Sequence, residues 1–280
     1  MRGQVVVITG GTSGIGEVAA EALAGRGARI VLIARDGARA AQTLEKLRAA
    51  CPGVSHSVHL ADLASIADTR RVGAEIAAAE PRIDALINNA GALFSRRQTS
   101  PDGLELTFAL NHMAYFVLTQ ALTARLTATP GARIISTASN AHSAGRLDFD
   151  DLQSTKRYAG FRAYGTSKLC NILFTRELSR RLSGTGVTAN CLHPGFVATR
   201  FGDQAGGLTQ ALIPLAKLVA VTPKQGADTI VYLASSPDVA GVTGQYFYKS
   251  KAIAPSAAAQ DDAAAARLWA ASEAIAAAVG

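Results

Sequence analysis

The chain has 280 residues, of which 49% are hydrophobic and 18% are charged, and its formal net charge at pH 7 is +7. This composition is typical of a globular protein with an ample core and argues against disorder. No apolar run approaches the roughly 18 residues that a membrane span needs, and the N-terminus lacks the cleavage site of a signal peptide. We therefore expect a soluble cytoplasmic protein without a membrane anchor.

The cysteines, histidines and basic residues exclude several classes of partner. Three widely spaced cysteines, Cys51, Cys170 and Cys191, offer neither a disulfide framework nor metal-ligand spacing. The five histidines form no paired ligand spacing on one helix, so we expect no metal. Basic residues occur in pairs such as Arg70-Arg71 without interleaved aromatic residues, which argues against nucleic-acid binding. A phosphorylated small cofactor explains part of the positive charge.

From residue 4 to about 194, short β-branched apolar runs alternate with longer segments whose apolar residues recur at helical spacing. The runs predict strands at Gln4–Gly10, Ala28–Arg35, His56–Asp62, Asp84–Ala90, Ala132–Ser139 and Val187–Pro194, with a seventh at Gly244–Tyr248. The other segments predict helices near residues 14–26, 38–50, 65–79, 102–127, 160–183 and 223–235. This order predicts an α/β fold: a single-domain Rossmann-type, doubly wound parallel sheet of about seven strands flanked by helices.

A glycine-rich turn lies between the first predicted strand and the first predicted helix, and it reads Thr9-Gly10-Gly11-Thr12-Ser13-Gly14-Ile15-Gly16. Glycines allow the backbone to turn tightly and let a pyrophosphate approach, while the helix N-terminus offers N–H groups and a positive dipole end. The spacing differs from G-x-G-x-x-G, and no Lys-Ser/Thr follows as in nucleoside triphosphate loops. An ordinary tight turn is the alternative to a dinucleotide site.

The end of the second strand indicates which dinucleotide would bind. Arg35 offers a guanidinium suited to a 2′-phosphate, where a carboxylate would instead bind the ribose hydroxyl. We therefore predict NADP(H). Asp36 is either a ribose ligand or, by our preferred interpretation, the cap of the next helix. Asp62 and Leu63, at the end of the third strand, are candidates for the adenine contact, although Asp62 can equally cap the helix that follows.

Four residues form a candidate catalytic set. Tyr164 and Lys168 stand four residues apart in a predicted helix and so share one face. We expect the Lys168 ammonium and an oxidised nicotinamide to lower the Tyr164 pKa from its usual value of roughly 10, and Lys168 to hold the nicotinamide ribose. Ser139 ends a strand at the carboxyl edge, where it can polarise a substrate carbonyl. Asn111 can hold a water that extends a proton relay from Lys168. Singly, each has a structural alternative: a surface pair, a helix cap or a solvent-facing asparagine.

Two further segments belong to the same predicted edge of the sheet. The small residues of Asn88-Asn89-Ala90-Gly91 let the nicotinamide half of a cofactor pack against the backbone, and the amides can tie strands together; a plain strand-to-turn signal is the alternative. His142 lies near Ser139 and can reach a substrate, but a structural histidine is our preferred interpretation.

In this order, these motifs and His193-Pro194-Gly195 resemble the short-chain dehydrogenase/reductase family over roughly residues 4–250. A closer resemblance, to the retinol-dehydrogenase-like branch, rests on Leu110-Asn-His112, Ser139-Asn-Ala-His142, Asn171-Ile-Leu-Phe-Thr-Arg-Glu-Leu178 and Arg267-Leu-Trp-Ala-Ala-Ser-Glu273. The resemblance implies a catalytic set made of Asn111, Ser139, Tyr164 and Lys168. It also implies a preference for NADP(H) and nicotinamide-end contacts from Pro194, Gly195, Val197 and Thr199.

The predicted activity is hydride transfer between NADP(H) and a carbonyl or alcohol carbon of a mostly apolar small molecule. The alternative is a non-catalytic NADP(H)-binding sensor or interaction module on the same fold. We assign residues 1–250 to a dinucleotide-binding catalytic domain with a candidate substrate lid at 200–221, and residues 251–280 to an Ala-rich, partly helical tail. The glycine turn departs from the usual Ala-Asn-Thr run of the branch, which argues against retinoids. Family members range from monomers to tetramers, so a homo-oligomer is compatible with the resemblance.

Overall fold

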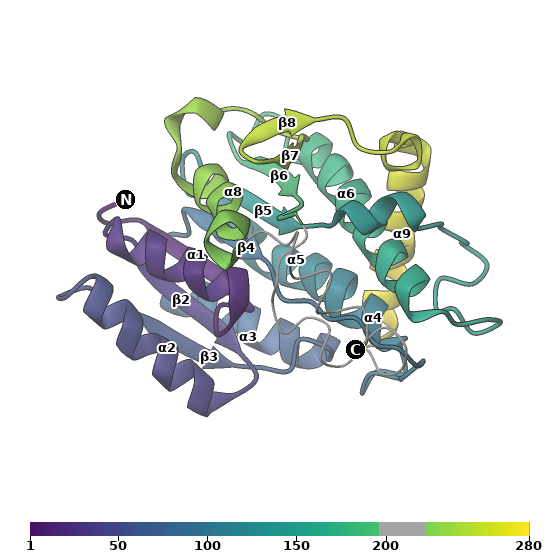
Figure 1. Cartoon of the computed structure of the whole chain (residues 1–280), viewed down its shortest axis with the longest axis horizontal. Coiled ribbons are helices and arrows are strands. Elements are labelled where there is room, and N and C mark those ends of the chain that lie inside the picture. Colours follow the sequence, from purple (N-terminus) through teal and green to yellow (C-terminus); the bar gives the residue numbers. More distant parts are fainter. Residues whose placement is uncertain (196–221, 280) are drawn as a thin grey trace.

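A computed structural model describes residues 1–195 and 222–279 (Figure 1). One eight-stranded sheet has the order β3-β2-β1-β4-β5-β6-β7-β8. The strands are β1 (Val5–Thr9), β2 (Arg29–Ala34), β3 (Ser57–Leu60), β4 (Ala85–Asn88), β5 (Arg133–Thr137), β6 (Thr188–Leu192), β7 (Tyr246–Tyr248) and β8 (Lys251–Ile253). Neighbouring strands are parallel except the antiparallel pair β7–β8. The strand order reverses at β1, between β2 and β4, where doubly wound sheets bind their ligands.

Helices cover both faces of this sheet (Figure 1). One face carries α1 (Gly14–Gly25), α2 (Gly37–Ala50) and α8 (Pro223–Ser235). The other carries α3 (Ile66–Ala79), α5 (Ala114–Thr127) and α6 (Gly160–Arg181). The C-terminal helix α9 (Asp262–Ala278) packs on α6. Among the residues described, no helix is both long and apolar enough to cross a bilayer.

The predicted fold class is confirmed, with one strand more than the seven expected. The additional strand, β8, escaped prediction because its three residues are all exposed and therefore carry no alternation of buried and exposed positions. The domain boundary placed at residue 250 stays a prediction. The candidate lid at 200–221 lies outside the described residues.

The predicted helix at 102–127 begins later than expected and is interrupted. The Glu105 carboxylate accepts hydrogen bonds from the N–H groups of Thr107 and Phe108, both at 2.8 Å, and so caps the short α4 (Leu106–Phe108). A π-helical turn, η1 (Ala109–Met113), then precedes α5. Such turns insert an extra residue into a helix and are frequent at functional sites. Asn111 stands in the middle of this one.

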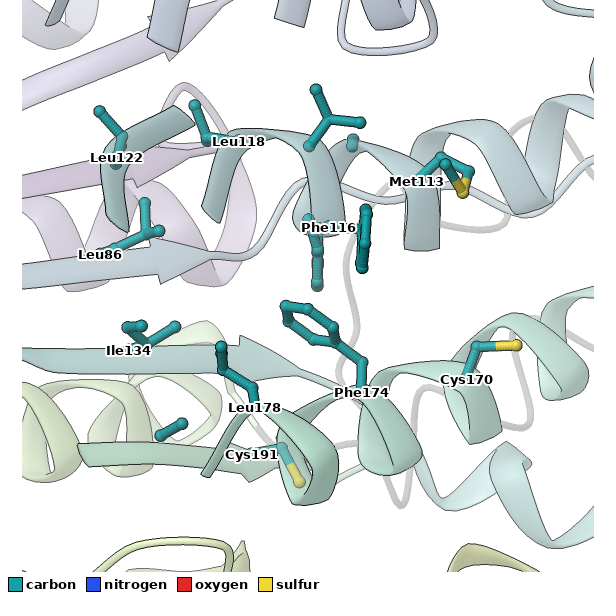
Figure 2. Close-up of a cluster of buried hydrophobic side chains, with 14 of the residues drawn as sticks. Leu86, Met113, Phe116, Leu118, Leu122, Ile134, Cys170, Phe174, Leu178 and Cys191 are labelled. Carbon is teal, nitrogen blue, oxygen red and sulfur yellow. The ribbon is translucent and has the colours of Figure 1, made fainter. Parts of the chain in front are cut away.

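An aromatic cluster joins α5, α6 and α9 in the core. Phe116 of α5 and Phe174 of α6 point toward each other between the two helices (Figure 2), with ring centroids 6.1 Å apart. Phe174 also stacks on Trp269 of α9 at 5.8 Å. The C-terminal helix therefore shares the core of the α6 face, although the sequence marked it only as an Ala-rich helical tail.

Candidate active site

The glycine turn between β1 and α1 forms a close-packed cradle at the carboxyl edge of the sheet. Gly10 and Gly14 have positive φ values of +64° and +58°, which glycine adopts without strain. A Cβ on Gly16 would lie 2.2 Å from the carbonyl oxygen of Gly10. Ser13, the N-cap of α1, makes no side-chain capping hydrogen bond, so it does not occupy the N–H groups of the first turn. With half-buried Thr12 and Ile15 beside it, this cradle fits the pyrophosphate of a dinucleotide.

Thr9 and Asn89 fasten the cradle to the neighbouring strands. Thr9 Oγ1 accepts hydrogen bonds from the backbone N–H groups of Asn89 at 2.8 Å and Ala90 at 3.0 Å. The Asn89 amide donates to the carbonyls of Thr9 and Gly10 at 3.2 and 3.3 Å, and its Oδ1 accepts from Thr137 at 3.2 Å. The tying role expected of the asparagine amides is therefore seen for Asn89, whereas the Asn88 amide donates to Thr119 of α5 at 3.1 Å. The fastening roles of Thr9 and Thr137 were missed, because a β-branched residue at a strand end carries no signal of its own.

We expect Gly16→Ala to weaken NADPH binding at least about tenfold and to lower the melting temperature, because the new methyl must displace the Gly10 carbonyl. The matched control is Gly25→Ala at the other end of α1, where an added Cβ would meet no described residue within 4 Å outside its own stretch of helix. It should leave NADPH binding unchanged and keep or raise stability by up to about 1 kcal/mol. Fluorescence titration with NADPH and thermal unfolding measure both effects. Equal affinities in the two variants would argue against a cofactor at this turn.

Arg35 and Asp36 follow β2 and differ in their surroundings. Arg35 is exposed directly after the strand. Asp36 caps α2: its carboxylate accepts from the Arg39 backbone N–H at 3.0 Å and from Arg39 Nε at 2.9 Å. These two hydrogen bonds hold the Asp36 pKa below its usual value. The capping interpretation of Asp36 is therefore the one that the geometry shows.

Asp62 and Leu63 lie in the turn after β3. Asp62 Oδ1 accepts from the Ala64 N–H at 3.0 Å, which closes a local turn. The cap of α3 is Ser65, whose hydroxyl accepts from the Asp68 N–H at 3.3 Å, so the alternative of Asp62 as the helix cap is wrong. Leu63 is buried. The contact of these two residues with adenine stays a prediction.

Tyr164, Lys168 and Ser139 meet at the end of β5. Lys168 Nζ lies 5.6 Å from the centre of the Tyr164 ring and donates to the Thr137 carbonyl at 2.9 Å. A side-chain hydrogen bond links Tyr164 with Ser139. Ser136, by contrast, is buried inside β5. Of the two serines, only Ser139 therefore stands at the edge where a ligand can reach it.

Burial controls the titration of the catalytic pair. It raises the pKa of Tyr164 to about 12, against the smaller effect of the Ser139 hydrogen bond, and it lowers the pKa of Lys168 to about 7. Our expectation of a lowered Tyr164 pKa is therefore wrong for the protein alone, because desolvation is the largest effect on this phenol and raises its pKa. Tyr164 holds its proton, which suits it to protonate a developing alkoxide.

Asn111 holds the backbone beside Lys168. Its amide donates to the Ala92 carbonyl at 3.0 Å and to Ser167 Oγ at 2.9 Å, and its Oδ1 accepts from the Ala92 N–H at 2.9 Å. The side chain is fully buried, so the solvent-facing alternative is wrong. A Cβ on Gly91 would lie 3.0 Å from Asn111 Oδ1 and 3.3 Å from Lys168 Nζ. Both amide hydrogens of Asn111 are used within the protein, and one lone pair of Oδ1 is left to accept from a water. The water relay stays a prediction.

Pro194 and Gly195 follow β6 at the same edge. Gly195 has a φ of +85°, and its N–H donates to His193 Nδ1 at 3.3 Å. The His193 ring stacks on Tyr248 of β7 with centroids 4.1 Å apart. The resemblance also implies contacts from Val197 and Thr199, and these two residues lie outside the described residues. Within residues 1–195 and 222–279, no group of three or more His, Cys, Asp or Glu side chains could hold a metal ion.

The parallel sheet, the glycine cradle at its switch point and the Ser-Tyr-Lys edge together define a nicotinamide-dependent oxidoreductase. The short chain dehydrogenase profile matches residues 4–206, and the chain belongs to that family. Its relatives place it in the retinol-dehydrogenase-like branch.

Individual relatives agree with this assignment. Human retinol dehydrogenase 14 is 42% identical over 98% of this chain and 86% of that protein. A protein of Streptomyces sp. (strain C5), provisionally named a daunorubicin C-13 ketoreductase, is 40% identical over 100% of this chain and 94% of its own length. The Pseudomonas aeruginosa RhlG/NADP active-site complex superimposes with a TM-score of 0.70 at 27% identity, covering 88% of this chain and 94% of that one.

Proposed function

We propose that this protein is an NADP(H)-dependent oxidoreductase acting on the carbonyl or alcohol carbon of a mostly apolar small molecule. The observation that carries the proposal is the meeting of Ser139, Tyr164 and Lys168 at one edge of the sheet, with the Tyr164 phenol buried against Ser139 and Lys168 Nζ 5.6 Å from its ring. When bound, the nicotinamide supplies or accepts the hydride.

The three side chains divide the proton chemistry among them. During reduction, Tyr164 donates its phenolic proton to the carbonyl oxygen as negative charge develops there. Ser139 Oγ accepts from the Ala141 N–H at 3.2 Å, and with a substrate bound its hydroxyl would donate to the same oxygen instead of bonding to Tyr164. Lys168, whose pKa burial lowers to about 7, would hold the ribose hydroxyls of the bound cofactor and can exchange protons near neutral pH.

An apolar substrate is supported by the surface near Tyr164. Phe161 stands one turn before Tyr164 on α6 and is 61% exposed, although a large apolar side chain is usually buried. Leu93 and Phe94, after β4, are half-buried. The names of the relatives refer to an alcohol, retinol, and to a ketoreductase. We therefore propose an apolar aldehyde, ketone or secondary alcohol as the substrate class.

Preference for NADP(H) is proposed from Arg35, and the NADP bound in the Pseudomonas aeruginosa relative is consistent with it. We expect Arg35→Ala to raise the KM for NADPH roughly 10- to 100-fold, because a charge-assisted hydrogen bond worth roughly 1.5–3 kcal/mol is lost, and to leave the KM for NADH unchanged. Arg48→Ala is the matched control, since Arg48 is exposed at the far end of α2. An equal change in the KM values for NADPH and NADH would mean that Arg35 does not bind the 2′-phosphate.

A panel of aldehydes, ketones and secondary alcohols, assayed with NADPH/NADP⁺ and with NADH/NAD⁺, tests the proposal. We expect turnover of apolar members with NADP(H) preferred. Tight NADPH binding without turnover across a broad panel would instead favour the non-catalytic sensor. The cytoplasmic location and the oligomeric state stay predictions, which cell fractionation and light scattering can test.

A further inference from the structure

His142 is a buried histidine whose two ring nitrogens both contact the protein. It is 3% exposed and lies in the short 3-10 helix η2 (Asn140–Ala144), which begins directly after Ser139. Nδ1 lies 2.8 Å from the carbonyl oxygen of Ser139. Nε2 lies 3.1 Å from the backbone nitrogen of Ser256, which is 114 residues further along the chain. The ring therefore connects the candidate catalytic serine to the C-terminal segment.

These two contacts specify one tautomer of the ring. The Ser256 N–H can only donate, so it requires an unprotonated Nε2, and the Ser139 carbonyl can only accept, so it requires a hydrogen on Nδ1. Only the neutral ring with its hydrogen on Nδ1 satisfies both. Burial lowers the pKa of His142 and so favours the neutral form, although a hydrogen bond to Ser139 acts in the opposite direction.

Among the described residues, the surroundings of the ring add no stronger partner. Tyr246 of β7 packs edge-on against His142 with ring centroids 5.2 Å apart. Its hydroxyl lies 3.4 Å from Nδ1, which is longer than the usual N–H···O distance. Both ring nitrogens are thus used within the protein, which supports the structural interpretation of this histidine over direct contact with a substrate.

Hydrogen bonds from His142 restrain the Ser139 peptide. The Ser139 carbonyl accepts from the His142 ring at 2.8 Å and from the His142 backbone N–H at 3.1 Å. The Ser139 hydroxyl is held by the Ala141 N–H in the same turn. Because the carbonyl and the hydroxyl belong to one residue, hydrogen bonds that hold this carbonyl also limit the movement of the Cα atom that carries the hydroxyl.

We infer that His142 is a positioning residue for Ser139. The backbone N–H of Ser256 selects the His142 tautomer whose Nδ1 hydrogen bonds to the Ser139 carbonyl. The inference rests on the proposed catalytic role of Ser139. It gives the C-terminal segment a part in the active site, because the Ser256 N–H directs the imidazole hydrogen toward Ser139 from the opposite side of the ring.

Two substitutions of His142 separate its two contacts. In His142→Asn the amide nitrogen can replace Nδ1 and keep the donor to Ser139, whereas in His142→Gln the amide oxygen can replace Nε2 and keep only the acceptor for Ser256. We expect kcat to fall roughly tenfold in His142→Gln and less than about threefold in His142→Asn, with the KM for NADPH within about twofold of wild type in both. A merely structural role would give equal kcat values, or values that follow the melting temperatures.

Ser256→Pro removes the backbone N–H that donates to His142 Nε2. Ser256 has a φ of −58°, close to the angle that proline requires, but the proline Cδ takes the place of the hydrogen that points at His142 Nε2, so the imidazole must also move away. Ser256→Ala keeps the N–H and is the matched control. Nitrogen-15 NMR, with the His142 signals assigned by their loss in His142→Gln, reads the tautomer directly. We expect the hydrogen on Nδ1 in wild type and Ser256→Ala, and a mixture of tautomers with lower kcat in Ser256→Pro.

Three results would overturn the inference: a hydrogen on Nε2 in the wild type, equal kcat values in the two His142 variants, or an unchanged kcat in folded Ser256→Pro. If Ser256→Pro does not fold, the wild-type tautomer and the comparison of His142→Asn with His142→Gln still decide. The NMR readout needs no turnover, so failure of the tautomer assignment is distinguishable from failure of the proposed oxidoreductase activity.

Discussion

Tyr164→Phe is expected to lower kcat by at least about a thousandfold while the Kd for NADPH stays within about twofold of wild type. The substitution removes only the phenolic hydroxyl of a buried ring, so packing is nearly conserved and the proton donor is lost. Single-turnover oxidation of NADPH with an apolar ketone measures the chemical step, and fluorescence titration measures cofactor binding.

Tyr158→Phe is the matched control for this substitution. Tyr158 lies six residues earlier, and its hydroxyl donates to the Phe94 carbonyl at 2.9 Å. Loss of that bond should cost about 1 kcal/mol of stability and leave kcat within a few-fold of wild type. Comparable activity in Tyr164→Phe and Tyr158→Phe would remove Tyr164 from the proton-transfer step.

Lys168→Met is expected to inactivate the protein and at the same time to stabilise it near neutral and acidic pH. Burial lowers the Lys168 pKa from 10.5 to about 7, so the charged side chain opposes folding. The penalty is full below about pH 7 and disappears as the pH rises toward 10.5, because between these values the unfolded chain binds a proton that the folded protein does not. The gain should be on the order of a few kcal/mol at pH 6.

Urea unfolding of wild type and Lys168→Met between pH 6 and pH 10 tests the sign of this effect. The free-energy gain of the variant should shrink steadily as the pH rises. Asn171 Nδ2 still donates to the Thr137 carbonyl at 3.2 Å in the variant, so that acceptor keeps a partner. Lys251→Met, on the exposed strand β8, is the control and should show no such pH-dependent gain. A gain that is absent or that grows with pH would mean that Lys168 is not held in a desolvated site.

The sequence predicted those parts of the site that depend on local pattern and on the topology of a parallel sheet. Strand runs and helical spacing placed most elements within a few residues of their observed bounds. Because the carboxyl ends of parallel strands share one edge, the glycine turn and Ser139 had to fall near each other. The helical spacing of Tyr164 and Lys168 then brought both side chains to the same place.

Features that depend on tertiary contact could not be predicted. The π-helical turn at Asn111 exists beside Ala92 and Ser167, which are 19 and 56 residues away in sequence. The direction of the Tyr164 pKa shift depends on burial, which the spacing of Tyr and Lys does not report. The contact between His142 and Ser256 depends on a strand, β8, too short to recognise.

Hydride transfer at this site is tested most directly with NADPH dideuterated at C4 of the nicotinamide and an apolar ketone. We predict that the wild-type product alcohol carries one deuterium at the former carbonyl carbon. Tyr164→Phe should bind the labelled cofactor equally well but transfer at least about a thousandfold less label in the same time. An unlabelled alcohol, or label transferred at the wild-type rate by Tyr164→Phe, would contradict the proposed activity.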